Sequence, residues 1–136
     1  MNTPELMGRI AASDRTFERD GGRWTGKCLI CNGWLSFDAR TGYGANVEHI
    51  QPRSLGGGND LLNLGLTHPR CNAEKGRNWD ATRRRRANPE GYRRLVEALQ
   101  RKRRERWRDA DAGRWAVGDE RGAGGAVGRR PGRPLD

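Results

Sequence analysis

The sequence has no long apolar stretch and little apolar material of any kind. Hydrophobic residues make up 33% of its 136 residues, and charged residues 32%. No run approaches the ~20 apolar residues of a membrane span, and the N-terminus has no signal-peptide hydrophobic region. We therefore expect one domain in a cytoplasmic protein. With so little apolar material, this domain needs a metal, disulfides or a partner to hold its fold.

Cysteine and histidine are also scarce, with three and two copies. Three cysteines cannot all pair within one chain, and cytosolic thiols stay reduced. Cys28 and Cys31 form a Cys-x-x-Cys pair, and His68 and Cys71 form a second pair with the same spacer. Two such pairs can complete the tetrahedral shell of a structural zinc ion. The spacing therefore predicts a zinc site that would supply folding energy.

A competing zinc shell uses His49 with the three cysteines. No cysteine or histidine lies three residues from His49, whereas His68 lies three residues before Cys71. We therefore favour His68 as the fourth ligand. This choice leaves His49 free to take part in chemistry.

Positive charge is concentrated in one segment. The formal net charge is +10; residues 1–80 carry 10 basic and 9 acidic groups, and residues 109–136 carry 5 of each. Residues 81–108 carry 12 basic and 3 acidic groups, a net charge of +9. Codon bias could explain 24 Arg against 3 Lys, but it does not explain the clustering. Such clustering is typical of a surface that binds a polyanion.

Local signals predict a small α+β chain. A helix over about residues 4–12 should begin at a Thr3 cap, and its apolar face consists of Leu6, Met7, Ile10 and Ala11. Residues 24–37 favour short strands around the metal-binding turn, and residues 45–50 can return as the second strand of that hairpin. A helix should begin near Pro69 and run through Lys75, whereas residues 61–66 are too few to classify.

The basic segment also contains a helix signal. Asn88, followed by Pro and Glu, predicts a helix start, and the apolar stripe of that helix is Tyr92, Leu95, Val96 and Leu99. Beyond Gln100 the stripe gives way to cations, so we expect the helix to leave the body. The predicted parts are an N-terminal helix and linker (1–22), a core (23–80), a basic helix (81–108) and a disordered tail (109–136).

The ordered motifs over residues 28–76 resemble those of a known family. They are Cys-x-x-Cys from Cys28, Glu-His-Ile-x-Pro from Glu48 with a Gly-Gly loop, Asn-Leu from Asn63, and Cys-Asn-x-x-Lys-Gly from Cys71. This order is similar to that of HNH endonucleases with the ββα-metal, or His-Me finger, fold. The resemblance implies a ββα-metal core that is stabilised by a structural zinc ion and flanked by helices. It also implies that the protein is an enzyme that hydrolyses DNA phosphodiester bonds.

The resemblance also implies roles for individual residues. His49 would be the general base, Glu48 and Asn72 would hold a catalytic Mg²⁺ or Mn²⁺ ion, and Asn63 would hold the loop and orient the base. Three positions depart from the commonest family pattern. Glu48 replaces an Asp, Asn72 replaces a His, and His68 stands where a Cys is commoner.

Basic side chains near the core are the expected contacts to double-stranded DNA. The candidates are Arg53, Lys75, Arg77, Arg83, Arg84, Arg85, Arg86, Arg103 and Arg104. Trp79 and Trp107 could stack on bases, although packing against the core is the better expectation for Trp79. The alternative is that these basic residues form a solvated charged surface that binds no partner.

Two other functions remain open from the sequence. A non-catalytic zinc-ribbon module would bind DNA or RNA without cleaving it, and a regulatory or assembly protein would use the zinc core as a scaffold. Among nucleases, the compact chain favours a phage-encoded or packaging-linked enzyme. Such an enzyme would act in a bacterial or phage-infected cell, with phage packaging proteins as partners.

Overall fold

The computed structural model describes residues 2–109. Its elements in chain order are α1 (Thr3–Ala12), β1 (Glu18–Asp20), β2 (Arg23–Lys27), β3 (Trp34–Asp38), β4 (Asn46–His49), β5 (Leu64–Thr67), α2 (Pro69–Lys75), a π-helical turn η3 (Gly76–Asp80), α3 (Thr82–Ala87) and α4 (Pro89–Glu105). Short 3-10 turns lie at Arg53–Leu55 and Leu61–Asn63. Of the described helices, none is long and apolar enough to cross a membrane. The predicted disordered tail falls outside the described residues, apart from Asp109.

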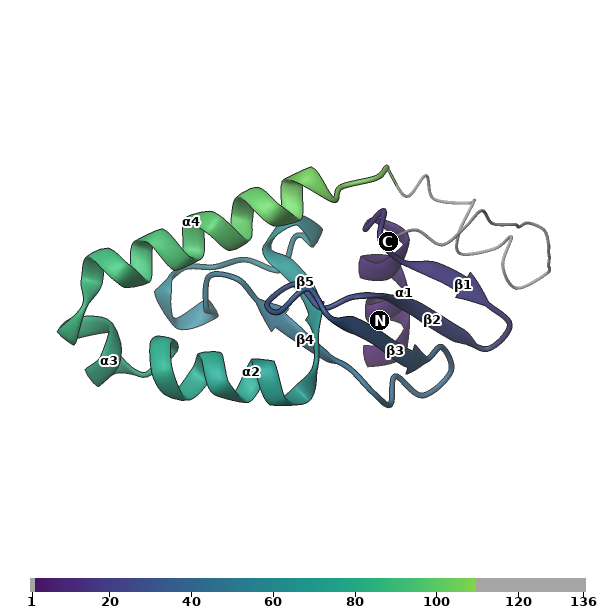
Figure 1. The fold of residues 1–136 in the computed structure, drawn as a ribbon, viewed down its shortest axis with the longest axis horizontal. Helices are drawn as coiled ribbons and strands as arrows, with labels where there is room; N and C mark the ends of the chain where they lie inside the picture. Colours follow the sequence, from purple (N-terminus) through teal and green to yellow (C-terminus); the bar gives the residue numbers. More distant parts are fainter. Residues whose placement is uncertain (1, 110–136) are drawn as a thin grey trace.

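The strands form two small antiparallel sheets. The first has the order β1-β2-β3, and the second is the β4–β5 hairpin. Figure 1 shows the hairpin between α2 and α4 at one end of the molecule, with the three-stranded sheet and α1 at the other. The antiparallel sheets and helices confirm the predicted small α+β fold, and the segment that the sequence left unclassified supplies β5.

The partner of β4 differs from the prediction. Residues 45–50 were expected to pair with the strand ending at Phe37, but β4 pairs with β5, with His49 opposite Leu64. β3 pairs instead with β2, across the metal-binding turn. The side chain of Asn63 closes the long loop between β4 and β5 by bonding to Gln51 on both its amide and carbonyl sides. This closure brings the short apolar segment beside β4.

Helix α1 begins one residue earlier than predicted. Its cap is Asn2 rather than Thr3: Oδ1 of Asn2 accepts from the Glu5 amide at 2.9 Å, and the Glu5 carboxylate accepts from the Asn2 amide at 3.1 Å. The reciprocal pair is a capping box. The predicted apolar face is confirmed, because Met7, Ile10 and Ala11 are buried and Leu6 packs against them.

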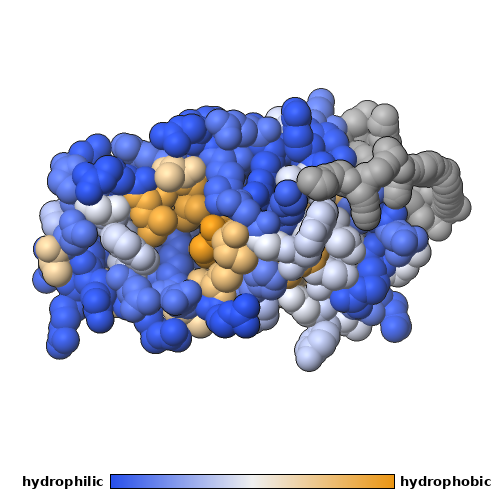
Figure 2. All heavy atoms as spheres, viewed as in Figure 1, coloured by the Kyte–Doolittle hydropathy of each residue, from blue (hydrophilic) through white to orange (hydrophobic). Residues whose placement is uncertain are grey.

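Buried apolar residues form two clusters. The larger joins α1 to the three-stranded sheet and β5, through side chains such as Ile10, Phe17 and Phe37. The smaller lies under α4, where Tyr92, Val96 and Leu99 pack with residues that include Leu29 and Ile50. Figure 2 shows hydrophobic residues at the surface between α2 and α4, on a face that is otherwise largely hydrophilic. The predicted apolar stripe of α4 is therefore what attaches this helix.

The end of α4 is docked on the body, contrary to the expectation that it leaves. Arg103 is fully buried, and its guanidinium donates to the carbonyls of Leu64, Ser13 and Leu61 at 2.7, 3.1 and 3.1 Å. Arg108 donates to carbonyls at the end of α1 and in the following turn, including that of Ala12 at 2.9 Å. A cation-rich helix end can pack on a protein where backbone carbonyls accept its donors.

We expect Arg103→Met to destabilise the fold by about 3 kcal/mol or more, because it leaves several buried carbonyls without their charged donor. Urea unfolding followed by tryptophan fluorescence measures this loss. Arg104→Met removes an exposed arginine from the neighbouring position and is the matched control, expected within about 0.5 kcal/mol of the parent. Equal effects of the two changes would contradict the structural role of Arg103.

Candidate metal centre and catalytic residues

The first half of the metal centre is the turn between β2 and β3. Cys28 and Cys31 stand on it, and the turn closes through the bond from the Asn32 amide to the Cys28 carbonyl at 3.0 Å. Asn32 has a φ of 65°, a left-handed conformation that asparagine tolerates. Backbone amides point at the sulfurs: that of Cys31 lies 3.5 Å from Sγ of Cys28, and that of Gly33 lies 3.3 Å from Sγ of Cys31. Such donors stabilise thiolates.

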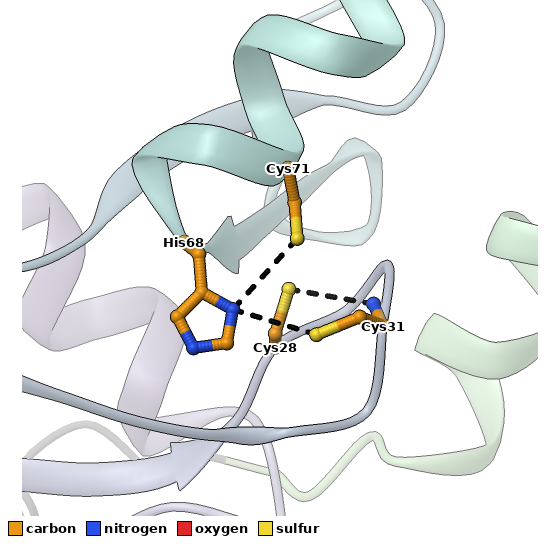
Figure 3. Close-up of side chains that lie close together, drawn as sticks. All are labelled: Cys28, Cys31, His68 and Cys71. Carbon is orange, nitrogen blue, oxygen red and sulfur yellow. Dashed lines mark hydrogen bonds between the residues drawn. The ribbon is translucent and has the colours of Figure 1, made fainter.

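The second half is the start of α2. His68 is the residue before the helix and Pro69 is its first residue. His68 and Cys71 are therefore about one helical turn apart, and both face the turn between β2 and β3. Nδ1 of His68 lies 3.4 Å from Sγ of Cys31 and 3.8 Å from Sγ of Cys71. Figure 3 shows the three sulfurs and this nitrogen converging on one point between the turn and α2.

The geometry of the four side chains fits zinc. Their ligand atoms all lie within 4.8 Å of one another. In a tetrahedral site with Zn–S distances of about 2.3 Å, sulfurs are about 3.8 Å apart, so small adjustments suffice. Nε2 of His68 lies 2.8 Å from the Trp34 carbonyl. Because a carbonyl only accepts, Nε2 carries the proton and Nδ1 keeps its lone pair for a metal.

The acidities of the cysteines also suit a cation. Burial opposes ionisation of Cys31, but hydrogen bonds from Gly33 and from the neighbouring ligands outweigh it and lower the pKa of its thiol to about 7. Burial, followed by the charge of Cys28, raises the pKa of Cys71 to about 12. Three thiolates cannot share this space without a cation to offset their repulsion. His68 is thus the fourth member of the cluster, and His49 lies outside it.

His49 ends β4 and is half buried. Its Nε2 lies 2.9 Å from Oδ1 of Asn59 in the glycine-rich loop. With the amide oxygen accepting, Nε2 carries the ring proton and Nδ1 is the nitrogen that can take a proton from water. The sequence did not predict a role for Asn59, since an asparagine after three glycines has the ordinary appearance of a turn residue.

Asn63 holds the loop that carries Asn59. Its Oδ1 accepts from the Gln51 amide at 3.0 Å, and its Nδ2 donates to the carbonyls of Gln51 and Gly58 at 3.1 and 2.9 Å. Gly57 allows this closure, because a Cβ there would lie 1.8 Å from the Gln51 carbonyl oxygen. Asn63 does not contact His49 through these bonds; the two are connected through the backbone of this loop.

Glu48 is buried beneath α2. Its Oε2 forms an ion pair with Nζ of Lys75, at 2.5 Å. Lys75 also bonds to Asp80 and to the Ile50 carbonyl. Burial raises the pKa of Glu48, while the Lys75 ammonium opposes that rise. Asn72 lies on α2, the helix that packs against β4.

The predicted phosphate contacts divide into two groups. The exposed ones are Arg53, Arg77, Arg83, Arg84, Arg86 and Arg104. Arg85 is half buried and donates to the Asp80 carbonyl, whereas Lys75 and Arg103 are buried and turned inward, so the structure gives these two other roles. Trp79 packs against the smaller core cluster, and Trp107 lies beside Arg103.

Comparison with known proteins agrees with this geometry. A sequence model of the family described as HNH endonuclease matches residues 28–78. No match to a curated protein or to a solved structure reaches significance. The matched range begins at the first cysteine of the cluster and contains the β4–β5 hairpin and α2. Residues 28–78, with their Cys₃His cluster, form an HNH endonuclease domain.

Proposed function

We propose that this chain is a metal-dependent endonuclease that hydrolyses phosphodiester bonds of DNA. The observation that carries the proposal is the state of His49: it lies in the HNH endonuclease domain, outside the cysteine cluster, with Nε2 held by Asn59. An imidazole held in this way presents Nδ1 as a base, and a positioned base contributes about 10²–10⁴-fold to the rate.

In the proposed reaction, Nδ1 of His49 takes a proton from a water molecule. The water oxygen forms a bond to phosphorus as the bond from phosphorus to the 3′ oxygen breaks. The products are a 5′-phosphate and, after the departing oxygen takes up a proton from solvent, a 3′-hydroxyl. Asn59 keeps the ring in the productive tautomer, and Asn63 keeps the loop that carries Asn59 in place.

Glu48 and Asn72 are the proposed ligands of a hard divalent ion, Mg²⁺ or Mn²⁺. Carboxylate and amide oxygens suit such ions, and Glu48 lies on β4 directly before His49, under the helix that carries Asn72. Lys75 already offsets the charge of this carboxylate, and it retains Asp80 as a second anionic partner. When bound, the ion supplies Lewis-acid neutralisation of the phosphate.

His68 and His49 should differ sharply in their effect on zinc. We expect the purified chain to hold one zinc ion through Cys28, Cys31, His68 and Cys71, and His68→Ala to lower its content and the melting temperature. His49→Ala should leave both unchanged. Elemental analysis and thermal unfolding, with and without a chelator, measure these effects, and loss of zinc from His49→Ala would contradict the assigned shell.

His49→Ala should lower plasmid nicking at saturating Mg²⁺ or Mn²⁺ by at least about 10²-fold, since it removes the base. DNA affinity and zinc content should persist, because neither depends on this ring. Gel analysis of supercoiled plasmid measures nicking, and Asn59→Ala is the graded control, expected to cause a smaller loss. A parent chain that binds DNA but does not cleave it with any divalent ion would favour the zinc-ribbon alternative.

Salt dependence of DNA binding tests the exposed arginines of α3. Substituting Arg83, Arg84 and Arg86 together by Gln should reduce the slope of log affinity against log salt by up to about 2.7, at about 0.9 per phosphate contact. Fluorescence anisotropy on duplex DNA measures the slope. Arg93→Gln is the control, because Arg93 is paired with Glu90 and Glu97 on α4 and should change the slope less. An unchanged slope in the triple variant would remove α3 from the interface.

A further inference from the structure

Two cations at the end of α4, Lys102 in its last turn and Arg106 directly after it, bind the turn that carries the first two metal ligands. Nζ of Lys102 donates to the carbonyls of Leu29 and Ile30 at 2.6 and 3.4 Å. The guanidinium of Arg106 donates to the carbonyl of Lys27 at 3.1 Å and to Oδ1 of Asn32 at 2.6 Å. Arg106 is buried and Lys102 half buried. The donors therefore hold carbonyls before, between and after the two cysteines.

These contacts bear on the thiolates through the peptide groups between them. The Ile30 carbonyl and the Cys31 amide belong to one planar peptide, whose two polar groups point in opposite directions. Lys102 lies on the carbonyl side, and Sγ of Cys28 lies on the amide side at 3.5 Å from the nitrogen. A cation on the carbonyl both fixes the peptide plane and polarises the amide toward sulfur.

The positive charges of Lys102 and Arg106 also favour the zinc-bound turn. A zinc ion with three thiolates and a neutral imidazole carries an excess negative charge, which is costly in a partly buried site. Arg106 also donates to the carbonyl of Cys28 itself at 3.4 Å. The ammonium of Lys102 and the guanidinium of Arg106 thus stand against the turn as counter-ions.

We infer that Lys102 and Arg106 are positioning residues of the metal centre, so that zinc binding and the docking of the α4 end reinforce each other. The inference rests on the proposed zinc ligands. It adds residues that support those ligands from a helix outside the range of the HNH domain. Zinc orders the turn whose carbonyls accept from α4, and α4 supplies the donors and charge that favour the zinc-bound turn. This coupling is reciprocal by linkage.

The direct test is the zinc affinity of Lys102→Met in the full chain, measured by competition with a chromophoric chelator. Loss of an outer partner of a metal site lowers affinity by about 10–100-fold, so the dissociation constant should rise by about tenfold or more. Arg101→Met removes the same charge from the adjacent, exposed position of α4 and should leave the constant unchanged. Equal zinc affinities of Lys102→Met and the parent overturn the inference.

A second measurement separates positioning from general stability. Hydrogen exchange of the α4 amides from residue 99 onward should slow when zinc is added to the metal-free parent, and this slowing should shrink in Lys102→Met. A purely structural contact would change exchange equally in both metal states, which would overturn the coupling. A parent chain that binds no zinc fails the zinc proposal itself, a result distinct from a zinc-binding parent with an insensitive α4.

Discussion

The convergence of two short chain segments on one point is the constraint on which the rest of the structure depends. The turn after β2 and the start of α2 lie far apart in sequence, and the side chains of Cys28, Cys31, His68 and Cys71 bring them together. Because α2 begins at this point, its direction across β4 is set there, and Lys75 reaches Glu48 two helical turns further on. The metal centre thus orients the helix that covers the proposed catalytic strand.

Cations act in this protein as internal donors as well as surface charges. The apolar stripe of α4 continues past Leu99 at the same helical spacing, but its inward positions are now Lys102, Arg103 and Arg106. Arginine can satisfy several carbonyls from one planar group, which suits ends of strands and helices whose acceptors lack partners. A small protein with few apolar residues can extend its interior in this way.

Sequence reasoning predicted the parts of the molecule whose chemistry is local. The zinc ligands follow from spacer length, α2 and the start of α4 follow from Pro69 and the Asn88 cap, and the buried face of α1 follows from helical period. The choice of His68 over His49 rested on the same spacing argument, and it is His68 that lies in the cluster with the three cysteines.

What the sequence left unpredicted depends on contacts between distant residues. The pairing of β4 with β5 occurs together with the loop closure made by Asn63, and the bond that holds His49 comes from Asn59, whose side chain has no local signature. The inward turn of Arg103 could not be read from a charge run, because composition does not say which positions meet free carbonyls. Long-range hydrogen bonding, rather than propensity, decided each of these cases.

The meeting of the N-terminal turn with the end of α4 has a consequence for the smallest fragment that can fold autonomously. The Arg15 amide donates to the Arg106 carbonyl, and the Arg108 amide donates to the Ser13 carbonyl, so two backbone hydrogen bonds join the segments that flank the family range. A fragment cut at the limits of the family range, residues 28–78, would lose both of these contacts, together with Arg103 and its acceptor Ser13. The independent folding unit is therefore larger than the range that matches the HNH family and includes the helices on either side of it.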